Sequence, residues 1–543
     1  MHMMTSTTLK EKTFMLLLAV TTFFVFNAAL PTDIMECRNL ITAHEMATDG
    51  NWLVPTMNGE LRLEKPPLPT WIAGAIECIA PGSLAAQRVA PGLAGCLWTL
   101  FLYLTARWLT KRRRYAFIAT VVFLTSYHIV QMGRTATWDI YCHAFMMGAI
   151  YYMMRGLGGS ASNRWRWLPL AGLMMGLSFL SKGPVSFYAL LLPALLAAVQ
   201  LTQLHTRGKW DAVVVMVVVC IVVSSWWYVY LLLFHSDATG AVIGKESGSW
   251  LNHNVRPWYY YWRYFAETGA WALIVLASLA VGYWRRHLRH PRTYAYAVAW
   301  MLLVLLMLSL MPEKKIRYLL PIMAPCALVT ACLLEHFISG RARLSVLTFR
   351  TTATVVSIIA AAAPVAVFVL HLTGIMQAVV FAALMWLTAA LLIHSLLRFK
   401  PMELVYGVGL VFMLVECFVL EGVGQMFGNP DKHSMRLVRN ERQLDSVPFC
   451  YPSDEPLRIE LVYEAGRKIL PVSRDSIATR LSEGPMALVS AGYAAEELDS
   501  RTLQLVDTVA IGIYDDNKHP KNNKHYTPDF VRHVTLLKSK QTK

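Results

Sequence analysis

Residues 212–233 read AVVVMVVVCIVVSSWWYVYLLL, a run of apolar, aromatic and serine residues without a single charge. A helix of this length extends about 33 Å, because each residue adds about 1.5 Å along the axis, and the hydrocarbon core of a bilayer is about 30 Å thick. The run is therefore long enough and apolar enough to cross a membrane. It indicates that the chain folds as helices within a bilayer.

Similar runs recur along the first four-fifths of the 543 residues, and only 15% of all residues are charged, against about 25% in typical soluble domains. The pattern predicts an α-helical polytopic membrane protein with about 13 transmembrane helices. The first run is read as a span rather than a signal peptide because so many others follow it. The expected spans lie near residues 13–30, 84–106, 115–132, 140–154, 167–180, 184–203, 211–233, 268–284, 293–311, 317–335, 351–371, 376–394 and 403–420.

The net charge of +16 comes largely from basic residues in the short loops between alternate spans, such as KRRR at 111–114. The positive-inside rule places those loops in the cytoplasm, so no nucleic-acid partner is needed to explain the charge. An odd number of spans with a cytoplasmic N-terminus then puts the C-terminus outside. We expect a multi-pass protein of a bacterial-type inner membrane, with long outer segments at 31–83 and 234–267.

After about residue 424 the long apolar runs give way to short segments. We expect residues 1–424 to form the membrane domain and residues 425–543 a small soluble α/β domain on the outer face. Short runs with apolar alternation predict strands at 457–464, 486–491, 503–514 and 531–538. Residues 474–484 fit an amphipathic helix between two of them.

Several ionisable residues break the charge pattern because they fall at the expected outer boundary of the membrane. Such positions are costly for a charge, so they suggest a functional site, although long side chains also reach from there to the lipid headgroups. Tyr318 lies at the same level. The charged residues are Asp33, Glu36, Glu64, Lys65, Arg134, Asp139, Lys182, Lys314, Lys315 and Arg317.

Two of these charges, Glu64 and Lys65, stand in ELRLEKPPLPTW at residues 60–71. Pro66 and Pro67 fix the backbone directly after them, which holds both side chains in a set direction. Upstream, a helix is expected from Asp33 to about Met46, with Gly50 placed to end it. Asp33 and Glu36 are three residues apart, so both carboxylates would lie on one face of that helix.

Five short elements together resemble one family. They are GNWLVP at 50–55, EKP at 64–66, the aspartate of TATWDIY at 135–141, LSKGP at 180–184 and KKIRYLLP at 314–321. The set resembles the GT-C integral-membrane glycosyltransferases that use polyprenyl-phosphate sugars. It is most similar to the ArnT-like aminoarabinose lipid A transferases, and more distantly to the protein O-mannosyltransferases.

The resemblance implies roles for individual residues. Lys65, with Glu64 beside it, resembles the lysine that binds the lipid phosphate, and Tyr318 resembles a tyrosine near that phosphate. Glu36 and Arg38 match an Asp-Glu-x-Arg motif in which Met35 replaces the aspartate, so Asp33 is expected to substitute for it. The predicted catalytic residues are Asp33, Glu36 and Asp139, and the predicted substrate- or phosphate-binding residues are Arg38, Glu64, Lys65, Lys182, Lys315, Arg317 and Tyr318.

The sequence leaves open whether the protein binds a divalent metal, and no other cofactor is expected. The family's outer-loop histidine would fall near Glu246 and Ser247, and His253 is the nearest histidine in the sequence.

The predicted reaction is transfer of a sugar from a polyprenyl phosphate to a lipid A-like, glycan or protein acceptor, with inversion. The basic side chains would stabilise the phosphate as it leaves. Two other classes remain as alternatives. A lipid or glycan transporter or flippase would spread its charges along a path through the spans. A structural or assembly protein would use its outer domain to recruit partners.

Overall fold

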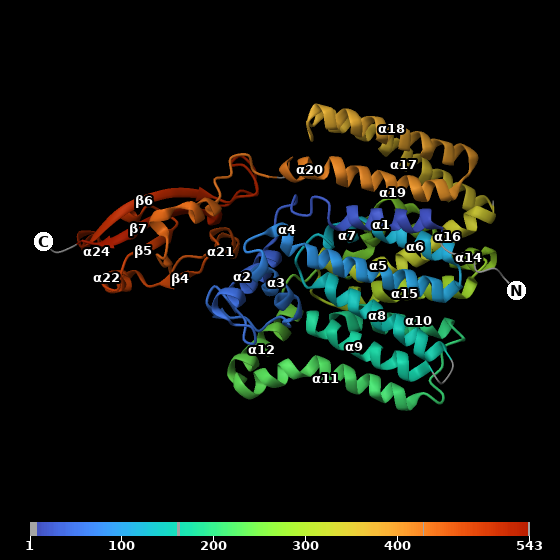
Figure 1. Cartoon of the computed structure of the whole chain (residues 1–543), viewed down its shortest axis with the longest axis horizontal. Helices are drawn as coiled ribbons and strands as arrows, with labels where there is room; N and C mark the ends of the chain where they lie inside the picture. The colour runs from blue at the N-terminus through green and yellow to red at the C-terminus, as the bar shows by residue number, and fades with distance from the viewer. Residues whose placement is uncertain (1–7, 160–162, 341, 427, 541–543) are drawn as a thin grey trace. The chain divides into compact units, whose positions relative to one another are not determined.

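The computed structural model describes residues 8–159, 163–340, 342–426 and 428–540. Helices follow one another along most of the chain, and the longer strands come near its end (Figure 1). Contacts divide the chain into two units. The helical unit comprises Met1–Ala28, Leu63–Pro69 and Ala85–Gly422, and the sheet unit comprises Ala29–Arg62, Thr70–Leu84 and Val423–Lys543.

The helical unit is built from α-helices joined by loops and by 3₁₀ and π segments, the longest of which is the 3₁₀ segment Trp258–Trp271. Its α-helices are α1 (Leu9–Phe23), α5 (Val89–Thr110), α6 (Arg113–Leu124), α7 (Tyr127–Met132), α8 (Asp139–Gly158), α9 (Arg164–Lys182), α10 (Leu192–Ala197), α11 (Trp210–Phe234), α12 (Ser236–Asn252), α13 (Ala272–Ala277), α14 (Val281–His287), α15 (Pro291–Leu310), α16 (Met323–Ser339), α17 (Arg343–Val369), α18 (Ile375–Arg398) and α19 (Pro401–Phe418). Three helices contain residues of both units: α3 (Leu68–Ile79), α4 (Leu84–Gln87) and α20 (Leu420–Met426).

Each of the thirteen expected spans is largely helical, and the chain is a multi-pass helical membrane protein. Within the described part of the chain, seven helices are long and apolar enough to cross a membrane. An eighth span would join Trp258–Ala277 to Val281–His287 across a bend of 79°. The other expected spans are shorter or interrupted. For example, α1 has 15 residues, and α6 stops where the Thr125 and Ser126 hydroxyls bond back to the carbonyls of Val121 and Val122.

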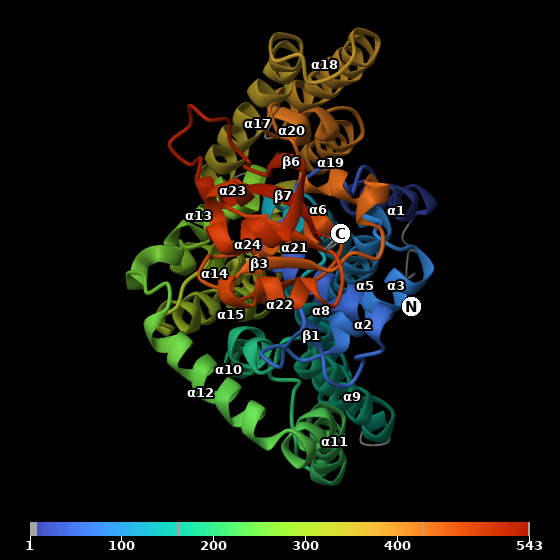
Figure 2. The ribbon, with the colours of Figure 1, turned by 90° about the vertical axis from the view of Figure 1, so that its left-hand side faces the viewer.

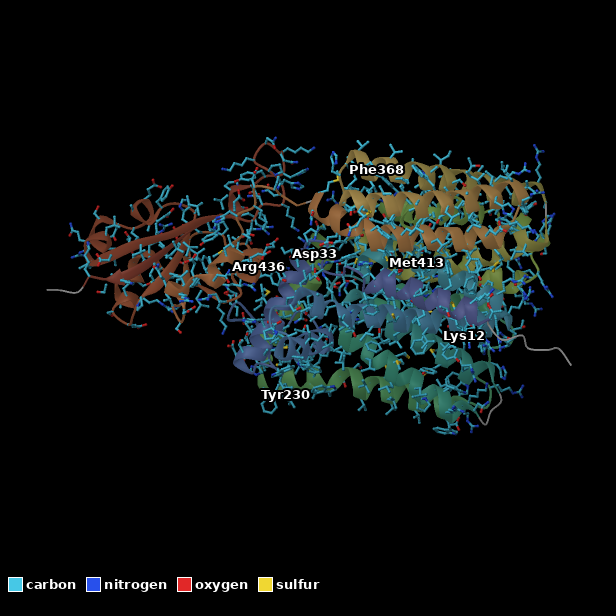
Figure 3. All side chains as sticks on the ribbon, turned by 45° about the horizontal axis from the view of Figure 1, so that its top comes forward. Lys12, Asp33, Tyr230, Phe368, Met413 and Arg436 are labelled. Carbon is cyan, nitrogen blue, oxygen red and sulfur yellow. The ribbon has the colours of Figure 1, made fainter. Side chains whose placement is uncertain are left out.

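Burial separates the centre of the helical unit from its outside. In an apolar 18-residue window of Ile316–Ser339, 94% of the residues are buried. In the corresponding window of Trp210–Phe234 only 17% are buried, and this helix exposes valines and leucines. Apolar side chains such as Phe368 of α17 project from the unit (Figure 3). Close packing between α9 and α11 depends on Gly172, where a Cβ atom would lie 2.2 Å from the carbonyl oxygen of Met216. Small residues permit this close approach of helices in a membrane.

The sheet unit contains a mixed five-stranded sheet in the order β4-β3-β5-β7-β6. Its strands β3, β6 and β7 are labelled in Figure 2. Strand β3 is parallel to β4 and β5, and β7 is antiparallel to β5 and β6. The strands are β3 (Phe449–Pro452), β4 (Ile469–Val472), β5 (Met486–Ser490), β6 (Val506–Asp515) and β7 (Val531–Ser539). The helices between them are α21 (Ile459–Ala465), α22 (Ile477–Leu481), α23 (Ala494–Glu497) and α24 (Ser500–Leu505).

Three expected strands and the expected helix are found, but the strand expected at 457–464 is wrong. These residues form α21, which buries Leu461, Val462 and Ala465 on one side and ends at Gly466 with φ 67°. The β-branched and aromatic residues favoured a strand, but packing against the sheet selected the helix. The short strands β3 and β4 were not expected from the sequence.

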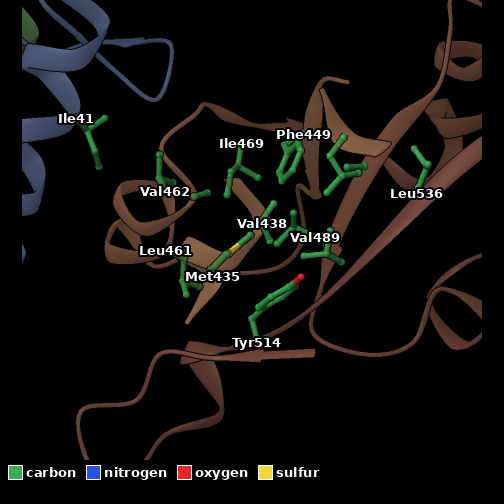
Figure 4. Close-up of a cluster of buried hydrophobic side chains, with 14 residues drawn as sticks. Ile41, Met435, Val438, Phe449, Leu461, Val462, Ile469, Val489, Tyr514 and Leu536 are labelled. Atoms are coloured by element: carbon green, nitrogen blue, oxygen red, sulfur yellow. The ribbon is translucent and has the colours of Figure 1, made fainter. Parts of the chain in front are cut away.

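The first long loop belongs to the sheet unit, apart from Leu63–Pro69. As the sequence predicts, it begins with a helix, α2 (Ile34–Asp49), which ends at Gly50 with φ 77°. Ile41 of α2 belongs to the same buried cluster as Met435, Leu461 and Val489 (Figure 4). A hairpin follows, formed by β1 (Thr56–Met57) and β2 (Glu60–Leu61). The Asn58 side chain at its turn donates to the Ile469 carbonyl at 2.7 Å and accepts from the Ile469 N–H at 2.8 Å.

Candidate functional site

A buried ion pair joins the start of α8 to the end of α9. The Lys182 ammonium group donates to the Asp139 carboxylate, and the two side chains are 9% and 3% exposed. Helix α9 ends there because Gly183 adopts φ 66°. Because burying two charges carries a large desolvation cost, such a pair is a weak source of stability and suggests another use.

The Lys182 ammonium also lies over the ring of Tyr318, with its nitrogen 5.1 Å from the ring centroid. Tyr318 stands in the 3₁₀ segment Ile316–Ile322, which directly precedes α16. Two more cations approach the same ring. The Lys315 nitrogen lies 5.9 Å and the Arg317 Cζ atom 5.7 Å from its centroid, within the range of cation–π attraction.

Glu313 completes this group. Its carboxylate accepts a 3.2 Å hydrogen bond from the Tyr318 hydroxyl and forms a 2.6 Å ion pair with the Lys315 ammonium. The Tyr261 hydroxyl fixes the same loop, because it accepts from the Lys315 N–H at 3.0 Å and donates to the Lys315 carbonyl at 3.1 Å. We refer to Asp139, Lys182, Glu313, Lys315, Arg317 and Tyr318 as the Tyr318 cluster.

The Tyr318 cluster thus gathers three cations and two carboxylates from parts of the chain about 180 residues apart, which leaves one positive charge in excess. Of the predicted site residues, it includes Asp139, Lys182, Lys315, Arg317 and Tyr318. Sequence reasoning missed Glu313, although it stands beside two lysines in PEKK at the end of an expected span. An acid at that boundary is as costly as a base, and this signal could have identified it.

A second buried pair supports the backbone of Arg317. His128 of α7 is fully buried, and its Nε2 atom lies 3.5 Å from the Arg317 carbonyl oxygen. Its Nδ1 atom lies 3.6 Å from the carboxylate of Glu267, which also pairs with Arg263 at 3.2 Å. Sequence reasoning did not find His128 or Glu267, because a lone histidine in an apolar stretch carries no signal of its own.

Glu64 and Lys65 lie in Leu63–Pro69, a short segment whose contacts place it in the helical unit. Both side chains are half-buried, and Pro66 and Pro67 after them are buried. The prolines therefore pack within the protein as well as restricting the backbone.

The remaining predicted residues, Asp33, Glu36 and Arg38, belong to the sheet unit. Asp33 is exposed and caps α2, where one carboxylate oxygen accepts 2.8 Å hydrogen bonds from the N–H groups of Met35 and Glu36. Glu36 is completely buried. One guanidinium nitrogen of Arg38 lies 4.0 Å from the Met35 sulfur. The geometry therefore gives Asp33 a capping function, whereas Glu36 is one of two buried carboxylates of α2, with Glu45.

Two other boundary cations bind the backbone. The Arg134 guanidinium group donates to the carbonyls of Val25 and Thr21, at 2.6 and 2.5 Å, where α1 ends. The Lys314 ammonium group donates to the Met311 carbonyl, and burial lowers the pKa of Lys314 from its ordinary value of 10.5. These contacts give both side chains a structural function.

The structure offers little support for a metal site. Among the residues that it describes, no group of three or more His, Cys, Asp and Glu side chains is placed to hold a metal ion. His253 is exposed, and the side chains of Glu246 and Ser247 lie outside the described residues.

Residues 64–228 match the family described as dolichyl-phosphate-mannose-protein mannosyltransferase. Two curated relatives are each called undecaprenyl phosphate-alpha-4-amino-4-deoxy-L-arabinose arabinosyl transferase. The one from Shewanella sediminis is 26% identical over 324 residues, covering 57% of this chain and 58% of the relative. The one from Aeromonas hydrophila is 26% identical over 330 residues, covering 58% and 59%. The chain thus matches less than two thirds of the length of these relatives.

Two solved structures share the fold over almost the whole chain. ArnT from Cupriavidus metallidurans bound to undecaprenyl phosphate superimposes with a TM-score of 0.72 at 17% identity, covering 98% of both chains. Its apo state gives a TM-score of 0.71 at 17% identity, covering 97% of both chains. The ArnT-like GT-C fold that the motifs indicate is confirmed.

Proposed function

We propose that this ArnT-like GT-C protein is a membrane glycosyltransferase. It moves a sugar from a polyprenyl phosphate to lipid A or a related envelope glycolipid. The sugar to test first is 4-amino-4-deoxy-L-arabinose, because the similar proteins carry it in their names.

The observation that carries this proposal is the Tyr318 cluster. Lys182, Lys315 and Arg317 approach one tyrosine ring, and burial makes the charge of Lys182 costly. Asp139 and Glu313 hold two of these cations in fixed positions before any substrate binds. Preorganised cations aimed at developing negative charge are usually the largest contribution to catalysis of this kind.

The reaction needs only one displacement at the sugar. An oxygen of the acceptor attacks the anomeric carbon while the bond from that carbon to the phosphate oxygen breaks. The phosphate keeps the electron pair and leaves with an added negative charge, which the cations of the Tyr318 cluster stabilise. Attack from the face opposite the leaving group inverts the anomeric carbon.

The nature of the acceptor decides which carboxylate is needed. An acceptor phosphate is already nucleophilic, and a carboxylate then only orients it. An acceptor hydroxyl needs a general base to take its proton. Among the predicted carboxylates, the buried Glu36 is proposed as this base, and Asp33 contributes through the capping of α2. Lys65, Glu64 and Arg38 remain proposed contacts to the donor phosphate.

A protein acceptor is the second candidate, because residues 64–228 match a family described by transfer of mannose to protein. The same displacement would then attach the sugar to a serine or threonine hydroxyl. That reaction requires the general base, so its rate should depend strongly on Glu36.

We also propose that the protein lies in the inner membrane, with its N-terminus in the cytoplasm and the sheet unit outside. The support is the basic character of alternate loops, including residues 111–114 and 285–292. Single cysteines introduced at residues 10 and 500 test the orientation. A reagent that cannot cross membranes should label residue 500 alone in intact inner-membrane spheroplasts, and labelling of residue 10 alone would reverse the topology.

Mass spectrometry of cells with and without the protein tests the function. Lipid A from producing cells should carry one additional aminopentose per modified phosphate, and cells with Lys182→Met should lack it. A sugar found on envelope proteins alone would favour the second candidate. Identical lipid A and envelope proteins in both strains would contradict a transferase.

A further inference from the structure

A charged cavity lies at the far ends of two helices, α15 and α16, whose other ends adjoin the Tyr318 cluster. Its walls come from three places: Arg112 between α5 and α6, Leu288 to His290 before α15, and the last turns of α16. The space between these walls, counted together with the open solvent at the mouth of the cavity, is about 300 Å³. It is therefore formed by segments that are distant in sequence.

Its distance from the Tyr318 cluster follows from helix length. Helix α15 runs from Pro291 beside the cavity to Leu310, three residues before Glu313. Its 20 residues extend about 30 Å, which equals the thickness of the hydrocarbon core. Helix α16 runs in the opposite direction, from just after Tyr318 to Ser339 at the cavity. The cavity and the cluster are therefore at opposite surfaces of the bilayer.

The lining of the cavity is predominantly basic. Arg112 and Arg289 face Glu335, and Arg112 forms a 2.8 Å ion pair with it. The Nε2 atoms of His290 and His336 are buried, and neither has a hydrogen-bond partner in the described part of the chain. Two arginines and two histidines thus gather around a single carboxylate. An anion with several oxygens would accept hydrogen bonds from the two arginines, and from a histidine whose Nε2 atom carries the proton.

The His336 ring is held in place at the cavity wall. It packs edge-on against Trp284, with ring centroids 6.0 Å apart. A Cβ atom at Gly340 would lie 2.5 Å from the His336 Cε1 atom, so only glycine leaves room for the ring in this position. The imidazole is therefore fixed before a ligand binds.

We propose that this cavity binds a phosphate group at the membrane surface opposite the Tyr318 cluster, with Arg112 and Arg289 as the charged contacts. Arginine pairs with phosphate through paired, charge-assisted hydrogen bonds, and basic pockets between membrane helices hold anionic headgroups. Two sources carry this chemistry, the headgroup of an anionic phospholipid and inorganic phosphate. The proposal does not depend on the glycosyltransferase function.

Native mass spectrometry of the purified full chain tests the proposal with phosphatidylglycerol and, separately, with inorganic phosphate. Loss of one arginine–phosphate contact should weaken binding about 10- to 100-fold in Arg289→Gln, because a hydrogen bond to a charged group contributes about 1.5–3 kcal/mol. The matched control is Arg286→Gln, which removes the same charge from an exposed position on α14 outside the cavity lining. Its binding should stay within about twofold of the wild type.

A second variant tests the cavity without changing its charge. Gly340→Ala should displace the His336 ring and weaken binding several-fold. Phosphatidylglycerol bound without competition from inorganic phosphate identifies a lipid, and binding of inorganic phosphate with the same dependence on Arg289 identifies a soluble ligand. Failure of both probes to bind, or equal binding by Arg289→Gln and Arg286→Gln, would overturn the proposal.

Discussion

Replacing the two residues of the buried Asp139–Lys182 pair, singly and together, separates the contribution of the pair to stability from its contribution to chemistry. Lys182→Met leaves the Asp139 carboxylate, 3% exposed, without its cation, and Asp139→Asn leaves the ammonium group, 9% exposed, without its anion. An uncompensated buried charge costs about 3–5 kcal/mol, so each single variant should lose about that much unfolding free energy. The double variant buries neither charge and should lose less than either single variant.

The measurement is the unfolding free energy of the four purified proteins in detergent, combined as a double-mutant cycle. We expect a coupling energy of about 3 kcal/mol or more between the two side chains, well above the limit of about 0.5 kcal/mol for independent sites. Sugar transfer is measured on the same samples. The double variant should recover stability but not turnover, because the Lys182 ammonium group is missing from the cations that face the leaving phosphate.

Two results would refute this reasoning. Additive losses of stability would mean that the two charges do not interact in the folded protein. Wild-type turnover in the stable double variant would make the pair a structural feature only, and the phosphate contact would then have to come from other residues.

Three further predictions concern single residues. Lys65→Ala should lose most of the transfer rate while its helical content and melting temperature stay unchanged, and near-normal turnover would remove Lys65 from the phosphate site. Asp33→Asn should keep both the α2 cap and turnover, since asparagine caps a helix as well as aspartate does. Glu36→Gln should be inactive. An equal loss of turnover in the two variants would mean that the two carboxylates share the chemistry. Burial acts to raise the pKa of Asp515, but hydrogen bonds, including one from the Tyr526 hydroxyl at 2.8 Å, hold it below its ordinary value of 3.8. Tyr526→Phe should therefore lower the unfolding free energy by about 1 kcal/mol at pH 7. This loss should fade as the pH falls below 3.8 and through the folded-state pKa of Asp515. A loss of unfolding free energy that does not depend on pH would exclude this hydrogen bond as its cause.

The membrane fold was predictable because its signal is local. Each apolar run is read from consecutive residues, and a charge at a predicted boundary is conspicuous without knowledge of its neighbours. This reasoning identified Asp139, Lys182 and Tyr318, which the structure brings together through the meeting of α8, α9 and the segment before α16. It could not identify Glu313 as the partner of Tyr318, because the sequence does not give the direction of a side chain in a loop.

The sheet unit was less predictable because its contacts join distant segments. Asn58 bonds to Ile469 across 411 residues, and Ile41 packs in a core otherwise formed after residue 434. The four-residue strands β3 and β4 are too short for a clear pattern. The residues of α21 favour a strand by their type, but they form a helix because the helix buries Leu461 and Val462.

The most direct test of the central claim is sugar transfer by the purified protein reconstituted with undecaprenyl phosphate–4-amino-4-deoxy-L-arabinose and lipid A. Mass spectrometry should show the gain of one aminopentose on lipid A and an equal amount of free undecaprenyl phosphate. The same reaction with Lys182→Met should show neither product. Movement of the intact donor across the bilayer with no broken glycosidic bond would contradict a transferase and favour a transporter.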